Sequence, residues 1–226
     1  MTTTARRVGY IGLGNLGFHL AHSLLKAGHQ LTITDLSKDL AEPLLAKGAT
    51  WATSAKEVAE RSDVVFTCLP SPKVIDTVVL GENGILAGSH DGMIWIDNST
   101  NDQEETIRLA ALCAAKGVRM LESPVTGGVH KAAAGDITVL VGGDEATFGD
   151  VAELLAVIGN PVLHMGPLGS AAVIKVITNM LAFIHLVAAG EALMLAKRGG
   201  LDLTKSFHAI LNSSGNSFVH ETESQV

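Results

Sequence analysis

Val8-Gly-Tyr-Ile-Gly12-Leu-Gly14-Asn-Leu-Gly17 is the stretch that decides the fold of this chain. An apolar run leads into a loop with glycines at positions 12, 14 and 17, and an amphipathic pattern follows over Leu16–Lys26. A strand, a Gly-x-Gly-x-x-Gly loop and a helix in this order are typical of a dinucleotide-binding unit, where the helix N-terminus faces a pyrophosphate. A glycine-rich structural turn is the alternative. The stretch predicts a phosphate-binding loop formed by Gly12, Leu13, Gly14, Asn15, Leu16 and Gly17.

The same alternation of short β-branched runs and helical patterns continues to about Met165. We expect strands at Val8–Ile11, Leu31–Thr34, Val64–Cys68, Met93–Ile96, Arg119–Leu121, Ile137–Val141 and Val162–Leu163. We expect helices at Leu16–Lys26, Lys38–Lys47, Gln103–Lys116 and Glu145–Ile158. This alternation predicts an α/β fold of the Rossmann type, with a doubly wound and mostly parallel sheet that is covered on both faces.

A different pattern begins at His164-Met-Gly-Pro-Leu-Gly169. A long helix is expected from Ser170 to about Arg198, followed by a second helix over Leu203–Leu211 with Asp202 as its N-cap. We therefore predict a cofactor-binding domain over residues 1–165. Residues 166–226 are expected to begin a helical domain for substrate binding or oligomerisation, and to form an incomplete one.

The most apolar part of the long helix, Val176–Gly190, is shorter than the roughly 20 residues of a membrane span and is interrupted by polar residues. We expect a buried helix there. One long helix and a short one cannot bury their own apolar faces, so they should pack on the first domain, on another subunit or on further chain. This predicts a homo-oligomer, most simply a dimer.

Composition narrows the choice of partners and compartment. The formal net charge is −7, and the 16 Lys and Arg residues form no cluster. A nucleic-acid or acidic-membrane partner is therefore not expected. Cys68 and Cys113 lie in apolar segments and predict reduced core thiols, and Arg6 and Arg7 are not followed by a secretory pattern. We expect a cytoplasmic protein without a metal site.

Asp35 follows the second expected strand, 18 positions after Gly17. An acidic residue at this place can accept hydrogen bonds from the adenosine ribose hydroxyls, which is the arrangement for NAD. An NADP site usually has an Arg nearby, but position 36 is Leu, although Lys38 is close. The sequence favours NAD over NADP. Alternatively, Asp35 only begins a turn before the next helix.

Two further loops also follow strands, where an open α/β sheet places its ligands. The first is Cys68-Leu-Pro-Ser-Pro72, and the second is Asp97-Asn-Ser-Thr100. The prolines alone would serve to start a helix, and Ser99 or Thr100 would serve to cap one. The positions of the loops favour ligand contacts through the residues Leu69, Pro70, Ser99 and Thr100.

Ser123-Pro-Val-Thr-Gly-Gly128 follows another expected strand. Successive N–H groups at a Gly-Gly turn can bind an anion, with the Thr126 hydroxyl as a further donor, so a small carboxylate fits. A plain connecting loop is the alternative. On the long helix, Lys175 and Asn179 lie four positions apart among apolar neighbours, on one face of the helix. Partial desolvation there would lower the pKa of Lys175 and suit it to acid–base chemistry.

Together these motifs resemble the β-hydroxyacid dehydrogenase family, which includes 3-hydroxyisobutyrate dehydrogenases. The resemblance extends through essentially the whole chain and rests on the glycine loop with Lys26-Ala-Gly-His29, Cys68-Leu-Pro, Asp97-Asn-Ser-Thr100, Ser123-Pro-Val-Thr-Gly-Gly128, Gly166-Pro-Leu-Gly169 and Lys175 with Asn179. It implies an NAD-dependent dehydrogenase of a small 3-hydroxy acid or its semialdehyde.

The resemblance also implies roles for single residues. Lys175 would be the general acid/base and Asn179 its hydrogen-bonding partner at the substrate. Ser99 or Thr100 would lie near the nicotinamide, Ser99 on the substrate side and Thr100 on the cofactor side. The substrate carboxylate would be held by Thr126, Gly127 and Gly128.

Some positions depart from the family pattern. Thr126 stands where Ser is usual, Ala171 where Gly is common, and Thr178 where Asn is common. Family members also continue for dozens of residues beyond Asn212-Ser-Ser-Gly-Asn216, so the chain is expected to be truncated. The alternatives are a nucleotide-binding homologue without catalytic activity, a semialdehyde, glyoxylate or imine reductase, a 6-phosphogluconate dehydrogenase relative and, last, a structural α/β protein.

Overall fold

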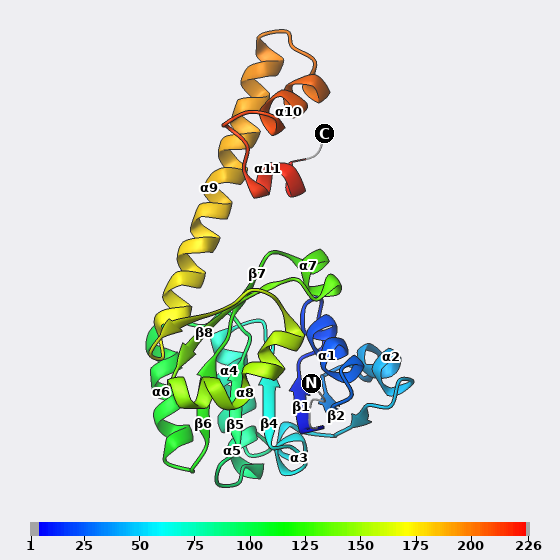
Figure 1. Ribbon diagram of the computed structural model, residues 1–226, viewed down its shortest axis with the longest axis vertical. Coiled ribbons are helices and arrows are strands. Elements are labelled where there is room, and N and C mark those ends of the chain that lie inside the picture. The colour runs from blue at the N-terminus through cyan, green and yellow to red at the C-terminus, as the bar shows by residue number, and fades with distance from the viewer. Residues whose placement is uncertain (1–4, 225–226) are drawn as a thin grey trace. The chain divides into compact units, whose positions relative to one another are not determined.

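The computed structural model describes residues 5–224, and the chain divides into two compact units with the break after Lys175. The first unit is a nine-stranded sheet in the order β3-β2-β1-β4-β5-β6-β8-β7, with β9 also paired to β8 (Figure 1). The strands are β1 (Arg7–Ile11), β2 (Gln30–Thr34), β3 (Thr50–Trp51), β4 (Val64–Thr67), β5 (Ile94–Asp97), β6 (Arg119–Glu122), β7 (Val125–Thr126), β8 (Thr138–Gly143) and β9 (Val162–Gly166). Only the pairings of β8 with β6 and with β7 are antiparallel, so the predicted mostly parallel sheet is confirmed.

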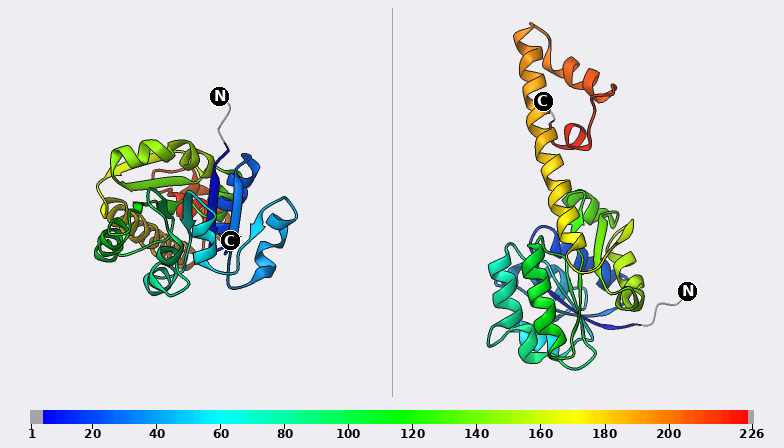
Figure 2. Two further views of the ribbon diagram at one scale, coloured as in Figure 1. Left: turned by 90° about the horizontal axis from the view of Figure 1, so that it is seen from below. Right: turned by 90° about the vertical axis from the view of Figure 1, so that its left-hand side faces the viewer.

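Helices cover both faces of this sheet. They are α1 (Gly17–Lys26), the 3-10 helix η1 (Lys38–Ala41), α2 (Glu42–Leu45), α3 (Ala55–Glu60), α4 (Pro72–Leu80), α5 (Ile85–Gly88), α6 (Gln103–Ala114), α7 (Val129–Ala134) and α8 (Glu145–Ile158). The long helix α9 (Ser170–Arg198) begins at the end of this unit. In the right-hand view of Figure 2, the teal and green helices of residues 72–114 stand on one side of the sheet and the yellow-green α8 on the other.

Two apolar cores result, one for each face. The core shared by α1, α2, α7 and α8 takes Val64 and Phe66 from β4, whereas the core shared by α3 to α6 takes Val65 from the same strand. Because successive side chains of a strand point to opposite faces, a strand buried on both sides must be apolar throughout. This is why β1, β4 and β5 read as continuous apolar runs in the sequence.

The carboxyl ends of the central parallel strands lie in one row across the sheet. Thr34 pairs with Ile11, Ile11 with Thr67, Thr67 with Asp97, and Asp97 with Glu122. Each of the loops that carries predicted ligand residues leaves the sheet directly after one of these five positions. The parallel register thus brings loops from residues 12 to 128 to one edge, as expected for a ligand site of an open α/β sheet.

Several elements differ from the sequence-based expectation. The predicted helix over 38–47 is instead the 3-10 turn η1 followed by the short α2, because Pro43 at the start of α2 has no N–H for a continuous helix. The two-residue strands β3 and β7 are too short to show an alternating pattern. Helices α3, α5, α7 and α11 are also additions, each of four to six residues.

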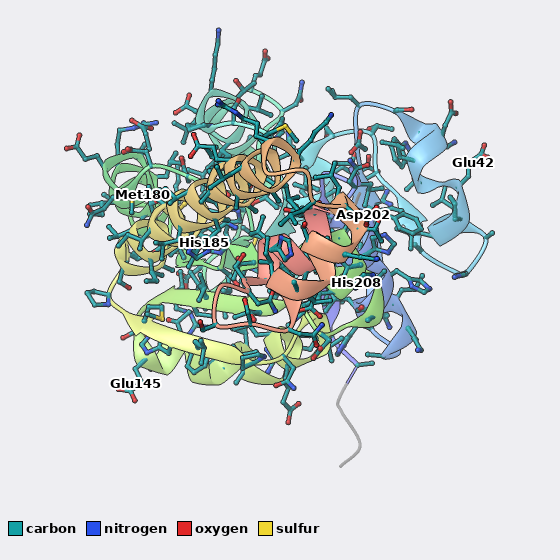
Figure 3. The ribbon with its side chains drawn as sticks, turned by 90° about the horizontal axis from the view of Figure 1, so that it is seen from above. Glu42, Glu145, Met180, His185, Asp202 and His208 are labelled. Carbon is teal, nitrogen blue, oxygen red and sulfur yellow. The ribbon has the colours of Figure 1, made fainter. Side chains whose placement is uncertain are left out.

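The second unit contains the rest of α9 together with α10 (Leu203–Leu211) and α11 (Phe218–Glu223). Asp202 caps α10 by accepting a hydrogen bond from the Lys205 N–H at 2.8 Å, as predicted. Phe207 and His220 form the small core of these two helices, with their rings 4.6 Å apart. Figure 3 labels Met180 and His185 on α9, and Asp202 and His208 at α10.

The expectation that the apolar part of α9 is buried is wrong within the described chain. Its exposed apolar residues are Val173, Val176, Ile177, Met180, Leu181, Phe183, Ile184, Leu186, Val187, Met194 and Leu195. By length and composition α9 could cross a membrane, since its most apolar window has a mean hydropathy of 1.9 and is only 11% buried. One helix of this kind is weak evidence for a membrane span. Burial depends on what covers a helix, which its own periodicity does not show.

Candidate functional site

At two positions of the segment that joins β1 to α1, the packing of the backbone requires glycine. Gly12 has a φ of +93°, and a Cβ there would lie 2.3 Å from the Cys68 carbonyl oxygen. A Cβ on Gly17 would lie 2.0 Å from the Gly12 carbonyl oxygen. Neither position can carry a side chain without moving backbone, so both glycines are needed for the close packing of β1, α1 and the loop after β4.

Gly14 is different. No atom of the described residues outside its immediate chain neighbours lies within 4 Å of the place where a Cβ on Gly14 would stand. Leu16 at the N-cap of α1 gives the helix no side-chain hydrogen bond, and the described first turn of α1 has no acidic residue. A glycine with open space above it, at the start of an uncapped helix, fits the close approach of a pyrophosphate to backbone N–H groups. The residues present therefore fit a dinucleotide.

Asp35 closes this loop from the end of β2. Its Oδ2 accepts a hydrogen bond from the Leu13 N–H at 2.6 Å, and its Oδ1 accepts one from the Ser37 N–H at 3.1 Å. Asp35 therefore begins a turn after β2, which was the alternative to a role in cofactor binding. It also fixes the glycine loop through the Leu13 N–H. Leu36 is fully exposed beside it, and Lys38 lies over the Trp51 ring, with Nζ 6.0 Å from the centroid.

The loops after β4 and β5 are joined by a buried polar network. The Trp95 indole N–H donates to the Thr67 hydroxyl at 2.9 Å, and this hydroxyl donates to Oδ1 of Asp97 at 2.8 Å. Oδ1 of Asp97 also accepts the Ser99 N–H at 3.0 Å, and the Ser99 hydroxyl accepts the Leu69 N–H at 2.8 Å. Burial raises the pKa of Asp97, while its hydrogen bonds to Ser99 and Thr67 oppose that rise. The network brings the predicted residues Leu69 and Ser99 together.

Neither Ser99 nor Thr100 caps the following helix, so that reading of the Asp97-Asn-Ser-Thr100 loop is wrong. Asp102 is the N-cap of α6, and its Oδ1 accepts the N–H groups of Glu104 at 2.8 Å and Glu105 at 3.2 Å. In the loop after β4, Pro72 does start α4, with Ser71 as its N-cap. The Ser99 hydroxyl is used in holding two loops together, and Thr100 is an exposed residue beside it.

The loop Ser123–Gly128 is fixed to its neighbour at its first residue. The Ser123 N–H donates to the Asp97 carbonyl at 2.6 Å, and the Ser123 carbonyl accepts the Asn98 side-chain N–H at 2.9 Å. Thr126 lies in β7 opposite Thr138, half-buried. Gly127 and Gly128 follow with φ values of +130° and +87°. Such a pair of positive-φ glycines is a conformation that can turn successive N–H groups toward one anion.

Lys175 lies in α9, at the end of the first unit, with only 9% of its surface exposed. Burial lowers its pKa from the ordinary value of 10.5. Asn179 follows four positions along the same helix, in the second unit. A lysine whose pKa is lowered by burial is better suited to proton transfer than a solvated one.

The first turn of α9 is held by Glu122, the last residue of β6. Its Oε1 accepts the N–H groups of Gly169 at 2.6 Å and Ala171 at 2.9 Å, and its Oε2 accepts the Ala172 N–H at 2.9 Å. Burial raises the pKa of Glu122, the three backbone hydrogen bonds oppose that rise, and the nearby Asp97 charge adds to it.

Sequence reasoning gave Asp97 and Glu122 no role. The local signal, an acidic residue at the end of a strand and immediately before a loop with predicted ligand residues, does not distinguish a buried acid from an exposed one. The two cysteines agree with the prediction of free thiols: burial raises the pKa of Cys68 and that of Cys113 to about 12 each.

Comparison with known proteins places the chain in a family. A family profile described as the NAD binding domain of 6-phosphogluconate dehydrogenase matches residues 7–166, and one described as the NAD-binding of NADP-dependent 3-hydroxyisobutyrate dehydrogenase matches residues 169–225. The chain is 38% identical over 213 residues to the probable mitochondrial 3-hydroxyisobutyrate dehydrogenase of Dictyostelium discoideum, covering 94% of this chain and 66% of that protein. It is 33% identical over 217 residues to the 2-(hydroxymethyl)glutarate dehydrogenase of Eubacterium barkeri, covering 96% of this chain and 72% of that protein.

Among solved structures, the 3-hydroxyisobutyrate dehydrogenase of Mycobacterium tuberculosis with L-serine is similar, with a TM-score of 0.87, 30% identity, and coverage of 97% of this chain and 74% of that one. An imine reductase from Myxococcus stipitatus is 20% identical over 92% of this chain and 71% of that one, with a TM-score of 0.83, which shows a shared fold alone. The chain spans about two thirds of the length of these curated relatives. By its two matched domains and its relatives, the chain belongs to the β-hydroxyacid dehydrogenase family.

Proposed function

We propose that this protein is an NAD-dependent oxidoreductase of a small 3-hydroxy acid or its semialdehyde, with Lys175 as the general acid/base. The observation that carries the proposal is the single register row from Thr34 to Glu122, which brings the loop Gly12–Gly17 and the loop Ser123–Gly128 to one edge of the sheet. Relatives named 3-hydroxyisobutyrate dehydrogenase support the substrate class. Because the chain spans about two thirds of those relatives, its activity is part of the proposal.

The cofactor would be held at the first half of the row. Within the loop Gly12–Gly17, the backbone N–H groups of Gly14, Asn15 and Leu16 would bind the pyrophosphate, since those of Gly12 and Leu13 donate to the Thr34 carbonyl and to Asp35. Asp35 would accept hydrogen bonds from the ribose hydroxyls. Leu69, Pro70 and Thr100 belong to the two loops next along the row and would line the nicotinamide side. Bound NAD⁺ would supply the hydride acceptor that amino-acid side chains lack.

NAD is proposed in preference to NADP. A 2′-phosphate would lie beside the Asp35 carboxylate, which repels it, and the next residue, Leu36, offers no positive charge. Lys38 is the nearest cation in sequence, and it lies over the Trp51 ring. Among related proteins, both cofactors occur: one relative is an NAD-dependent L-serine dehydrogenase of Pseudomonas aeruginosa, and one similar structure is a complex with NADP⁺.

Lys175 would move the proton. In oxidation, neutral Lys175 would take the proton of the substrate hydroxyl while the same carbon gives up its hydrogen as a hydride to the acceptor that bound NAD⁺ would supply, and a C=O bond forms. In reduction, protonated Lys175 returns this proton to the carbonyl oxygen. Its lowered pKa increases the fraction of neutral amine at a given pH, which favours the role of base.

The substrate carboxylate would be bound at the other end of the row. Gly127 and Gly128 would direct backbone N–H groups at it, and the Thr126 hydroxyl would donate a further hydrogen bond. Ser99 would contact the substrate from the neighbouring loop. The role of Asn179 as a hydrogen-bonding partner of the substrate rests on the family resemblance. With the carboxylate fixed, the distance from it to the hydroxyl-bearing carbon differs between a 2-hydroxy and a 3-hydroxy acid. This distance would decide which of the two places its hydroxyl at Lys175.

The test is the absorbance of reduced nicotinamide with NAD or NADP and a panel of 2-hydroxy and 3-hydroxy acids. Turnover with NAD on a 3-hydroxy acid is the expected result. Binding of NADH without turnover of any member of the panel would instead show a nucleotide-binding protein without catalytic activity.

We also propose that the protein forms a homo-oligomer through α9, in preference to a contact with a membrane or a nucleic acid. A groove along α9 is lined by Leu186, Val187, Met194 and Leu195 together with Glu191 and Arg198. An apolar groove with both signs of charge can pair with a copy of itself in a two-fold contact between identical subunits, so the proposed occupant is a second copy of this chain. A cytoplasmic location stays a prediction from the sequence.

A further inference from the structure

Glu122 is a buried carboxylate that the proposed chemistry does not use. It is 3% exposed, and it accepts three hydrogen bonds from N–H groups that lie 47 to 50 positions further along the chain. The first four N–H groups of a helix have no partner within the helix, and here one carboxylate satisfies three of those at the start of α9, while the Ser170 N–H donates to the Pro167 carbonyl at 3.1 Å. The described first turn of α9 has no acidic residue of its own, so Glu122 supplies the negative charge that a helix N-terminus favours.

The absence of a side chain at Gly142 makes room for this carboxylate. Gly142 of β8 is the register partner of Glu122, and a Cβ on Gly142 would lie 2.2 Å from Oε1 of Glu122. Gly169, which donates to the same oxygen, has a φ of +95°. Gly142 therefore leaves the space that the carboxylate occupies, and the positive φ of Gly169 favours glycine at the residue that donates to it.

The clamped turn is the one that precedes the lysine. Ala171 lies four positions and Ala172 three positions before Lys175, so these residues occupy adjacent places on one side of α9, and each residue of a helix advances it by about 1.5 Å. Hydrogen bonds to their N–H groups fix both the axial position and the rotation of this turn. The place of the Lys175 amine thus depends on where the Glu122 carboxylate holds the helix.

The same residue also begins the proposed carboxylate loop. The peptide after Glu122 donates from Ser123 to the Asp97 carbonyl at 2.6 Å, and the loop continues to Gly128. The substrate-binding loop and the start of α9 are therefore attached to one point of the sheet.

We propose that Glu122 is a positioning residue, which sets the Lys175 turn of α9 at a fixed distance from the Ser123–Gly128 loop. This rests on the proposed function of these two segments. Glu122 would thereby keep the distance between the Lys175 amine and the carboxylate of the bound substrate constant. A loss of the clamp should slow proton transfer while leaving the cofactor site, at the other end of the row, intact. A displacement of about 1 Å at a reacting group can cost on the order of 100-fold in rate.

The test compares Glu122→Gln with Glu145→Gln, which removes an exposed carboxylate from the first turn of α8 (Figure 3). In Glu122→Gln, the side-chain amide can no longer accept all three hydrogen bonds. We expect faster amide hydrogen exchange over residues 171–175, a fall in kcat of about 10- to 100-fold, and an NADH Kd within about twofold of the wild type. Glu145→Gln should change none of these.

A kinetic isotope effect separates positioning from simple stability. With substrate deuterated at the hydroxyl-bearing carbon, a misplaced lysine makes the chemical step slower relative to product release, so the isotope effect on kcat should rise. A fall in kcat that equals the loss of folded protein, with an unchanged isotope effect, would overturn the proposal, because it would show a structural role only.

Gly142→Ala provides an independent approach to the same carboxylate. It should mimic Glu122→Gln, and in a Glu122→Ala background it should have little further effect, because no carboxylate is left to displace. Additive losses in this double-mutant cycle would contradict the proposal. If the wild type turns over no substrate, the proposed function fails, and amide exchange alone then decides: unchanged protection of residues 171–175 in Glu122→Gln overturns the positioning role, and lost protection supports it.

Discussion

Asp97 and Glu122 are register partners at the ends of β5 and β6, and both carboxylates are buried. Burial raises the pKa of each, and the charge of Asp97 raises that of Glu122 further. Each carboxylate holds backbone N–H groups of a site segment: Asp97 that of Ser99, and Glu122 those at the start of α9. Burying two adjacent acids costs stability. In return, their hydrogen bonds hold the Ser99 loop and the start of α9, which the proposed function requires.

Replacement of Asp97 by Asn should make stability less sensitive to pH. Because the folded-state pKa of Asp97 is raised, the native state keeps its proton where the unfolded state, with an ordinary pKa near 3.8, has lost it. The wild-type free energy of unfolding therefore falls as pH rises above about 3.8. The introduced amide would keep an acceptor for Thr67 and Ser99 without titrating. Relative to wild type, the variant should gain stability as pH rises, by an amount of order 1 kcal/mol.

Urea unfolding at several pH values from 4 to 8 measures this difference. Removal of the Asp97 charge also removes one cause of the raised pKa of Glu122. This second effect likewise makes the stability of the variant less sensitive to pH. Parallel pH curves for wild type and Asp97→Asn would show that the buried carboxylate does not resist ionisation.

Gly14→Ala should separate cofactor binding from folding. Apart from its two chain neighbours, the added methyl group meets no atom of the described residues within 4 Å, so the protein should fold with little change in melting temperature. It would occupy the space proposed for the pyrophosphate, and NADH binding should weaken by tenfold or more, about 1.4 kcal/mol. Titration of NADH fluorescence measures the affinity.

Gly149→Ala is the matched control, since this glycine lies in α8 with similarly open space around it. It should stabilise the protein by about 0.5–1 kcal/mol and leave NADH binding unchanged. Equal NADH affinity of Gly14→Ala and wild type would mean that the loop does not approach the cofactor.

The Asp35→Ala substitution tests the choice of cofactor. The variant loses the bond to the Leu13 N–H as well as the proposed ribose contact, so both NADH and NADPH should bind more weakly through the loosened loop. Because the repulsion of a 2′-phosphate also disappears, the ratio of NADH to NADPH affinity should fall by about tenfold. Asp39→Ala, an exposed carboxylate in η1, should leave the ratio unchanged. A ratio that does not respond to Asp35→Ala would contradict the assignment.

The exposed face of α9 predicts self-association. The wild type should be a dimer or a larger oligomer by light scattering at micromolar concentration. Leu195→Glu places a charge on an apolar residue that is 73% exposed in one chain, and it should shift the population toward monomer. Ile107→Glu on α6 is the control and should not. A monomeric wild type would refute the contact.

The glycine loop and the strand ends could be predicted from sequence because they are local patterns. A β-branched run, a glycine spacing and a following amphipathic stretch together define one βαβ unit, and parallel strands then bring Asp35, Ser99 and Thr126 to the same edge without further information. The short strands β3 and β7 could not be predicted, because two residues show no period.

The roles of Asp97 and Glu122 depend on partners far along the chain. Thr67 lies 30 positions before Asp97, and Gly169 lies 47 positions after Glu122. No local pattern distinguishes such an acid from an exposed one at a strand end. The exposure of α9 was predicted wrongly for a similar reason, since an apolar stripe shows that a helix needs cover but not that the described chain provides it.

The most direct test of the central claim is turnover of NAD and a 3-hydroxy acid by Lys175→Ala, beside Lys116→Ala as a control that removes an exposed lysine. If Lys175 carries the proton, Lys175→Ala should lose about 100-fold or more in kcat while binding NADH as the wild type does, and Lys116→Ala should keep full activity. Wild-type turnover that survives the loss of Lys175 would contradict the account.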